Sequence, residues 1–137
     1  MINSETLANI RVAVFTLTAG VCVLYAVMSL ILGRPDPMPW WIPSAFGVAA
    51  GVILTLTSRI AGPGQADMAW DEGYSADASR AASTAFWVGI FMYPLFGVLM
   101  ALGLVDYPLT FAVMGLLTAA CYLSMIVWFD LRGRAQG

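Results

Sequence analysis

The run IRVAVFTLTAGVCVLYAVMSLILG, Ile10 to Gly33, decides the fold of this chain. After Arg11 it carries no charge, and its length matches the roughly 20 residues that a helix rising about 1.5 Å per residue needs to cross about 30 Å of hydrocarbon. A backbone in lipid must satisfy its own polar groups, which favours a helix. The run is longer than the apolar part of a secretory signal, Glu5 precedes it and no A-x-A-like site follows it, so we expect it to be retained as a membrane span.

Three further apolar stretches of similar length follow, at 40–60, 84–105 and 108–129, with their charged residues at the ends. Hydrophobic residues make up 61% of the 137 positions, and the loops are too short to hold a second folded unit. The sequence therefore predicts one domain, residues 1–137, that is all-α: a polytopic membrane protein with a bundle of four transmembrane helices.

Arginine residues in the flanks predict the orientation of the spans. Four crossings place the two termini and the middle segment 61–83 on one side, together with most of the basic residues, which are Arg11, Arg59, Arg80, Arg132 and Arg134. Only Arg34 lies on the other side. Because positively charged flanks stay in the cytoplasm, we expect a bacterial inner-membrane protein with both termini cytoplasmic and the turns 34–40 and 105–108 outside.

Turn and capping residues predict the ends of the helices. Gly33 and Pro35 favour an end of the first helix, Ser4 is the expected N-cap at its start, and Ser75 is the expected N-cap of a helix that continues into the third span. The outer turns share the pattern L-G-x-x-D at 32–36 and 102–106, which suggests two parallel helical hairpins related by duplication. Turn chemistry alone also favours these residues.

Small residues recur at a spacing of four along the second and third spans. Such stripes let helix backbones approach closely, which matters in lipid because packing drives helix association there. The pairs are Gly47 with Gly51, Ala78 with Ala82, Ala81 with Ala85 and Gly97 with Ala101. We favour packing within the chain, and packing against a second chain is the alternative.

Tyr93 and Pro94 lie in the middle of the third span. A proline there removes one ladder hydrogen bond, leaves the carbonyl of Ile90 partly unpaired and bends the helix. A plain kink is the favoured interpretation. The alternative is a small pocket lined by the tyrosine hydroxyl, as in the broken helices of transporters.

The most distinctive polar feature is the middle segment around Trp70, Asp71, Glu72 and Tyr74. We favour a local electrostatic role, in which the two carboxylates pair with arginines at the same interface. Docking of a basic partner through the acidic and aromatic side chains is the second interpretation, and a metal or catalytic site is the third. A second pair, Arg11 with Asp130, is expected to join the first and last helices at this end, worth about 1 kcal/mol or less if it is wet.

The composition argues against several function classes. The chain has no His and a net charge of −2, and its spans hold no ionisable group that titrates near neutral pH. Proton-coupled transport, haem ligation and acid–base catalysis are therefore not expected, nor is nucleic-acid binding. Cys22 and Cys121 sit in apolar surroundings without ligand partners, so we expect them to be structural. We expect no cofactor, no metal ion and no catalytic residue.

The element Trp70-Asp71-Glu72-Gly73-Tyr74-Ser75, followed by Ala78-Ser79-Arg80-Ala81 and an apolar span, resembles a group of small bacterial and archaeal four-span membrane proteins. In those proteins an acidic D-E-R element precedes a small-residue helix, and Gly73 stands here in place of the arginine. The resemblance implies a four-span membrane protein, and it carries no activity and no site residue.

Three functions follow from these features. The first is a non-catalytic accessory or interaction subunit of a membrane complex, which fits a chain with packing stripes and no titratable core. The second is a homo-oligomeric carrier or pore for a neutral or hydrophobic small solute, with Tyr93 and Pro94 on its route. The third, a lipid-modifying enzyme that uses Asp71 and Glu72, lacks a base and a transition-state stabiliser. The lipid bilayer is the expected partner in each case, with a membrane protein or further copies of this chain beside it.

Overall fold

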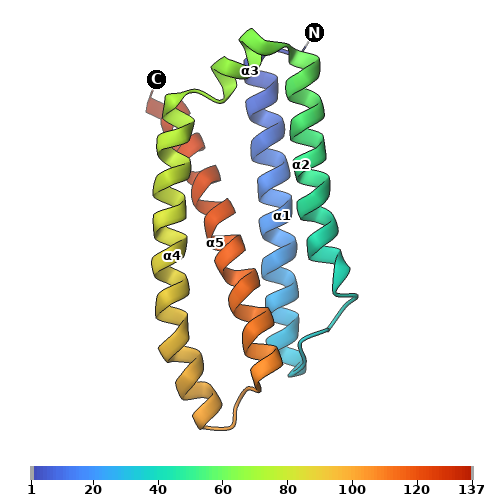
Figure 1. The fold of residues 1–137 in the computed structure, drawn as a ribbon, viewed down its shortest axis with the longest axis vertical. Helices are drawn as coiled ribbons and strands as arrows, with labels where there is room; N and C mark the ends of the chain where they lie inside the picture. Colours follow the sequence, from blue (N-terminus) through green and yellow to red (C-terminus); the bar gives the residue numbers. More distant parts are fainter. Residues whose placement is uncertain (1, 137) are drawn as a thin grey trace.

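The computed structural model describes residues 2–136, and over this range it contains helices and no strands (Figure 1). The helices are α1 Ser4–Leu32, α2 Trp41–Ala61, α3 Pro63–Ala69, α4 Glu72–Ala101 and α5 Tyr107–Gln136. Four of them, α1, α2, α4 and α5, are long and apolar enough to cross a membrane. The all-α class and the four long apolar helices predicted from the sequence are thus confirmed.

The start of α1 differs from the prediction by one residue, and its end agrees. Asn3, rather than Ser4, is the N-cap, because its side chain accepts a hydrogen bond from the backbone N–H of Thr6 at 2.7 Å. At the other end Gly33 adopts φ 64°, a left-handed conformation that suits glycine and stops the helix.

The third long helix, α4, begins and ends earlier than the apolar pattern indicates. Its N-cap is Asp71, whose carboxylate accepts a hydrogen bond from the N–H of Tyr74 at 2.9 Å, so the expectation of a cap at Ser75 is wrong. The helix ends at Ala101, because Gly103 turns the chain at φ 70° and Asp106 then caps α5. Hydropathy alone extends the third span to 105 because the turn residues before Asp106 are also apolar.

The short helix α3 was not predicted, since its seven residues lie in the polar middle segment. Gly62, at φ 86°, turns the chain after α2, and Pro63 opens α3 at the position where its missing N–H leaves no hydrogen bond unmade. The helix lies across the ends of α1 and α2, at the end of the molecule where both termini are found (Figure 1).

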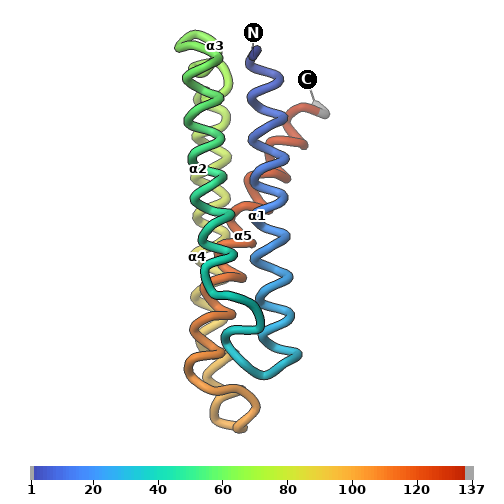
Figure 2. Tube along the Cα trace, turned by 90° about the vertical axis from the view of Figure 1, so that its right-hand side faces the viewer, coloured from blue at the N-terminus to red at the C-terminus, as the bar shows by residue number. Residues whose placement is uncertain are grey.

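The long helices form an open bundle. The extensive contacts are those of α1 with α2, α1 with α5 and α4 with α5, so the order across the molecule is α2, α1, α5, α4. Figure 2 shows α2 and α4 displaced to the same side of α1. The predicted hairpins, α1 with α2 and α4 with α5, are both present and are joined by α1 and α5.

Two clusters of buried side chains hold this arrangement. Toward the end opposite the termini, Ala26 of α1 packs with Phe96 of α4 and with Leu109 and Val113 of α5. At the end that carries the termini, Leu7 packs with Ala61 and Ala69. The second cluster fixes α3 against α1, which positions the side chains described next.

Candidate functional site

Arg11 is the centre of the most polar region of the molecule. Only 4% of its surface is exposed, although it is a cation. Its Nη1 donates a hydrogen bond to the backbone carbonyl of Ala69, and its Nη2 lies 2.9 Å from Oδ2 of Asp130. Because these partners come from α3 and α5, one side chain of α1 joins the middle segment of the chain and its last helix to the first.

Two aromatic rings cover the same guanidinium. Its central carbon lies 4.1 Å from the ring centroid of Tyr74 and 5.1 Å from that of Trp70, distances at which ring faces attract a cation. The two rings meet edge to face with centroids 4.9 Å apart, and Trp70 Nε1 donates to the hydroxyl of Ser58 at 3.1 Å. The segment between α3 and α4 is therefore fixed to α2 as well as to α1.

The carboxylate of Asp130 serves two arginines. Besides Arg11, it accepts hydrogen bonds from Nε and Nη2 of Arg134 at 3.0 and 3.1 Å, and Arg134 also donates to the side chain of Asn9. The predicted pair of Arg11 with Asp130 is confirmed. The pair is not solvent-exposed, because the side chains of Arg11 and Asp130 are only 5% and 13% exposed.

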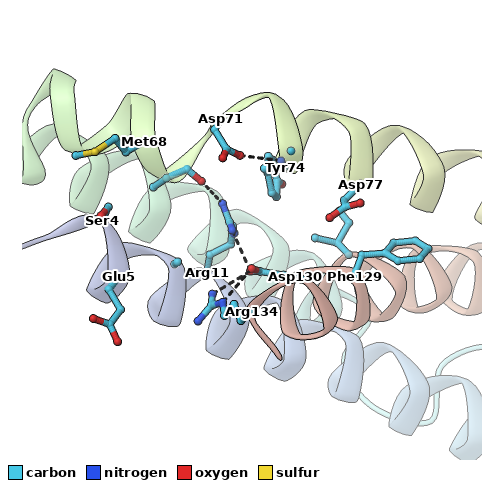
Figure 3. Close-up of a pocket in the computed structure, with 15 residues that line it drawn as sticks. Ser4, Glu5, Arg11, Met68, Asp71, Tyr74, Asp77, Phe129, Asp130 and Arg134 are labelled. Atoms are coloured by element: carbon cyan, nitrogen blue, oxygen red, sulfur yellow. Dashed lines mark hydrogen bonds and ion pairs between the residues drawn. The ribbon is translucent and has the colours of Figure 1, made fainter. Parts of the chain in front are cut away.

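A cavity of about 630 Å³ opens beside this network (Figure 3). Its wall carries the carboxylates of Glu5, Asp71, Asp77 and Asp130 together with the guanidinium groups of Arg11 and Arg134. Carboxylates therefore outnumber cations in this cavity, and the outer ones, Glu5 and Asp71, are exposed.

The expected local pairing of Asp71 and Glu72 with arginines is wrong. The carboxylate of Asp71 is the N-cap of α4, and Glu72 is exposed. Neither residue forms an ion pair among residues 2–136. Arg80 pairs instead with Asp77, at 3.6 Å, and Arg134 pairs with Asp130. Asp67, on α3, is also exposed. We call Asp67, Asp71 and Glu72 the acidic corner.

The small residues singled out in the sequence have different surroundings. Gly47 and Gly51 are exposed, and a Cβ added at either would meet no atom within 4 Å, so the expected packing within the chain is wrong for this pair. α2 faces α1 through Ala50 and Leu54 instead. The other expected positions, Ala78, Ala82, Gly97 and Ala101, are half-buried or exposed.

Small residues of α4 are also buried within the chain. Ala81 and Ala85 are buried, and a Cβ on Gly89 would meet the side chain of Thr118 at 3.5 Å. Of the pairs predicted along this helix, Ala81 with Ala85 is therefore buried within the chain, whereas Ala78 is half-buried and Ala82 is exposed.

A second cavity, of about 950 Å³, runs between α4 and α5, and we call it the α4–α5 groove. Tyr93 lines it and is 69% exposed, whereas Pro94 lies inside α4 and outside the lining. Small and aromatic residues make up most of its walls: Ala82, Ala85, Phe86, Gly89, Tyr93, Phe111, Gly115, Ala119 and Tyr122.

The described part of the chain holds no cluster of three or more Cys, Asp or Glu residues close enough to bind a metal ion. Cys22 is buried and Cys121 half-buried, and both are free thiols. The chemistry offered by the Arg11 region is that of charge and hydrogen bonding rather than of nucleophilic attack.

Sequence reasoning identified Trp70, Tyr74 and Arg11 but did not bring them together. Part of the signal was present: Arg11 stands at the start of a long apolar run, and Trp70 and Tyr74 are four residues apart. Their meeting depends on α3, the element that hydropathy could not detect.

Comparison of the chain with known protein families, with curated proteins and with solved structures found no match.

Proposed function

We propose that this chain is a non-catalytic interaction subunit of a membrane complex, and that it docks its partner through the acidic corner. In this proposal α1, α2, α4 and α5 cross a bacterial inner membrane, and both termini lie in the cytoplasm. Four helices of sufficient length and hydropathy support the membrane location. The excess of arginine at the end that carries the termini supports the orientation.

One observation carries the docking proposal: the acidic corner is exposed, unpaired within residues 2–136, and held in place. Trp70 and Tyr74 pack on Arg11, so the backbone on both sides of Asp71 is fixed before any partner arrives. A surface that is already ordered loses less conformational entropy on binding.

The chemistry of the partner follows from the charge and place of this surface. Cytoplasmic flanks of membrane proteins carry an excess of Lys and Arg. A neighbouring membrane protein therefore presents complementary charge at the level of Asp67, Asp71 and Glu72. Such contacts between exposed charges weaken as salt screens them, with a screening length of about 8 Å at physiological ionic strength.

The test is co-purification from native membranes in a mild detergent. The tagged chain is expected to bring down another membrane protein, and the double variant Asp71→Asn, Glu72→Gln is expected to lose it, because it removes two charges while asparagine keeps the N-cap of α4. Asp106→Asn is the matched control, since Asp106 caps α5 at the opposite end of the molecule. Recovery of this chain alone from wild-type membranes contradicts the proposal.

The α4–α5 groove favours a second candidate function, a homo-oligomeric carrier or pore for a neutral or hydrophobic solute. Its lining is mostly apolar and includes the hydroxyls of Tyr93, Tyr107 and Tyr122, as expected of a site for a small apolar ligand with few polar groups. Flux through liposomes that is unchanged by Tyr93→Phe and Tyr93→Ala removes the reason for this candidate.

The resemblance of the element at 70–75 to small four-span membrane proteins belongs to the same proposal. Its support is the position of the element, because Asp71 caps α4 and Glu72 opens it, directly before a long apolar helix.

A further inference from the structure

The α4–α5 groove cannot stay empty in a bilayer. Its volume is about 950 Å³, and the aromatic side chains at its edges stand clear of the rest of the chain: Phe86 is 60% exposed and Phe111 75%. An unfilled space of this size loses the dispersion contacts of every atom around it. Water has too few polar partners along such a lining. An apolar occupant is therefore required.

One face of α2 contacts nothing else in this chain and has a shape that could fit the α4–α5 groove. Gly47, Gly51, Thr55 and Arg59 follow one another at a spacing of four residues, so they form a single ridge along the helix. All four are exposed. Since a Cβ at Gly47 or Gly51 would meet nothing within this chain, the ridge presents bare backbone over one helical turn, which allows close approach of another helix.

Charge at the ends of the two features is also complementary. α2 runs toward the end that carries the termini and α4 runs away from it, so a ridge and a groove from two copies meet antiparallel. Arg59 lies eight residues beyond Gly51, about 12 Å, and Glu72 lies ten residues before Ala82, about 15 Å, at 1.5 Å per residue. With Gly51 opposite Ala82, the two charges stand at the same level to within one turn.

We propose that the occupant of the α4–α5 groove is α2 of a second copy of this chain, with Arg59 of one copy against Glu72 of the other. Within residues 2–136 neither Arg59 nor Glu72 has an ion-pair partner. A lipid tail fills the groove but leaves both charges unpaired, which is why the second copy is the better fit. The inference rests on the bilayer location proposed above. It pairs Glu72 with the second copy, which leaves Asp67 and Asp71 of the acidic corner for another protein partner.

The open shape of the bundle suits a two-fold pair. Because α2 and α4 lie on the same side of α1, a rotation of 180° about an axis normal to the bilayer brings α2 of each copy toward α4 of the other (Figure 2). Each contact is then made twice, as in the closed dimers that are the commonest homo-oligomers.

The first test replaces the glycine on the ridge. Two differently labelled copies are reconstituted in phospholipid vesicles, and their association is measured by energy transfer. Gly51→Leu is expected to weaken association by about tenfold or more, because it blocks close backbone approach. Gly20→Leu is the matched control: Gly20 is also exposed in a long helix, and a Cβ added there would meet no atom within 4 Å, so both variants fold, and circular dichroism checks this.

The second test reverses the charges. Arg59→Glu alone and Glu72→Arg alone are each expected to weaken association, because both contacts of the pair then join like charges. A mixture of the two variants is expected to associate as unlike copies, since both contacts between them again join opposite charges. The chain that carries both substitutions is expected to self-associate again. Failure of both the mixture and the double variant to recover association overturns the assignment of this pair.

The remaining outcomes are decisive as well. Equal association of Gly51→Leu and Gly20→Leu overturns the proposal. A wild-type chain that is monomeric in vesicles also overturns it, and a lipid retained at the groove is then the occupant. A chain that is monomeric but still captures another membrane protein through Asp71 and Glu72 refutes this inference and leaves the proposed function standing. A chain that dimerises but captures no other membrane protein supports this inference and contradicts the proposed function.

Discussion

Arg11 is a cation that contacts with α3, α4 and α5 remove almost completely from solvent. Moving such a group out of water is unfavourable unless its charge and its hydrogen bonds are satisfied. Asp130 supplies the opposite charge, the carbonyl of Ala69 supplies an acceptor, and the rings of Tyr74 and Trp70 supply their negative faces. Removal of any one of these partners therefore weakens the stabilisation of the buried charge that all of them share.

The sharpest test at this scale is Asp130→Asn. The variant leaves Arg11 buried without its counter-charge, so the free energy of unfolding is expected to fall by about 3 kcal/mol or more. Asp77→Asn is the matched control, because Asp77 is half-buried and its partner Arg80 is exposed, and pairs of this kind within a helix contribute at most about 0.5 kcal/mol. Unfolding in mixed detergent micelles measures both, and equal losses would show that Arg11 is not desolvated in solution.

The boundaries of the helices are set by a few residues whose backbone conformation is special. Gly33, at φ 64°, closes α1, and Gly62 and Gly103 turn the chain at φ 86° and φ 70°, positive values that favour glycine. A side chain at these positions clashes with the following carbonyl, at a cost of roughly 1–2 kcal/mol. Glycines within the helices have no such role.

This difference predicts opposite signs for one substitution at two glycines. Gly33→Ala is expected to destabilise the protein by about 1 kcal/mol, because alanine is strained at positive φ. Gly20→Ala, inside α1 with open space around its Cα, is expected to stabilise it by up to about 1 kcal/mol through helix propensity. Thermal unfolding of the two variants side by side measures the signs, and a loss at Gly20 would place that glycine in a contact.

Hydropathy predicted the long helices because a span is a property of about 20 consecutive residues and needs no partner. It misplaced the end of α4, since the residues from Leu102 to Val105 are as apolar as the helix before them. It missed α3, whose seven residues are ordered by packing of Ala69 on Leu7 and not by their own propensity.

On the scale of the whole molecule, the arrangement of the helices carries information that the sequence did not. The pair of Arg11 and Asp130 was predictable from equal depth in two spans. The exposure of Gly47 and Gly51 was not, because the order α2, α1, α5, α4 decides which faces of α2 meet protein. The aromatic cover of Arg11 was also hidden, since it depends on the turn between α3 and α4.

The position of both termini and α3 at one end of the molecule predicts the outcome of topology mapping. In a background without Cys22 and Cys121, single cysteines at Glu72 and at Asp36 are expected to react with membrane-impermeant reagents from opposite sides. Glu72 should be protected in intact cells and Asp36 should be labelled. Labelling of both from the same side would contradict the proposed number of crossings, and the reverse pattern would contradict the orientation.

The bond between Arg11 and Asp130 also has a consequence for biosynthesis. Arg11 leaves the ribosome with the first helix and Asp130 with the last, and chains are made from the N-terminus. Throughout translation the nascent protein therefore holds a guanidinium without its counterion at the edge of an apolar segment. Only a polypeptide that includes Asp130 can close this end, so a product terminated before that residue keeps the unpaired charge of Arg11.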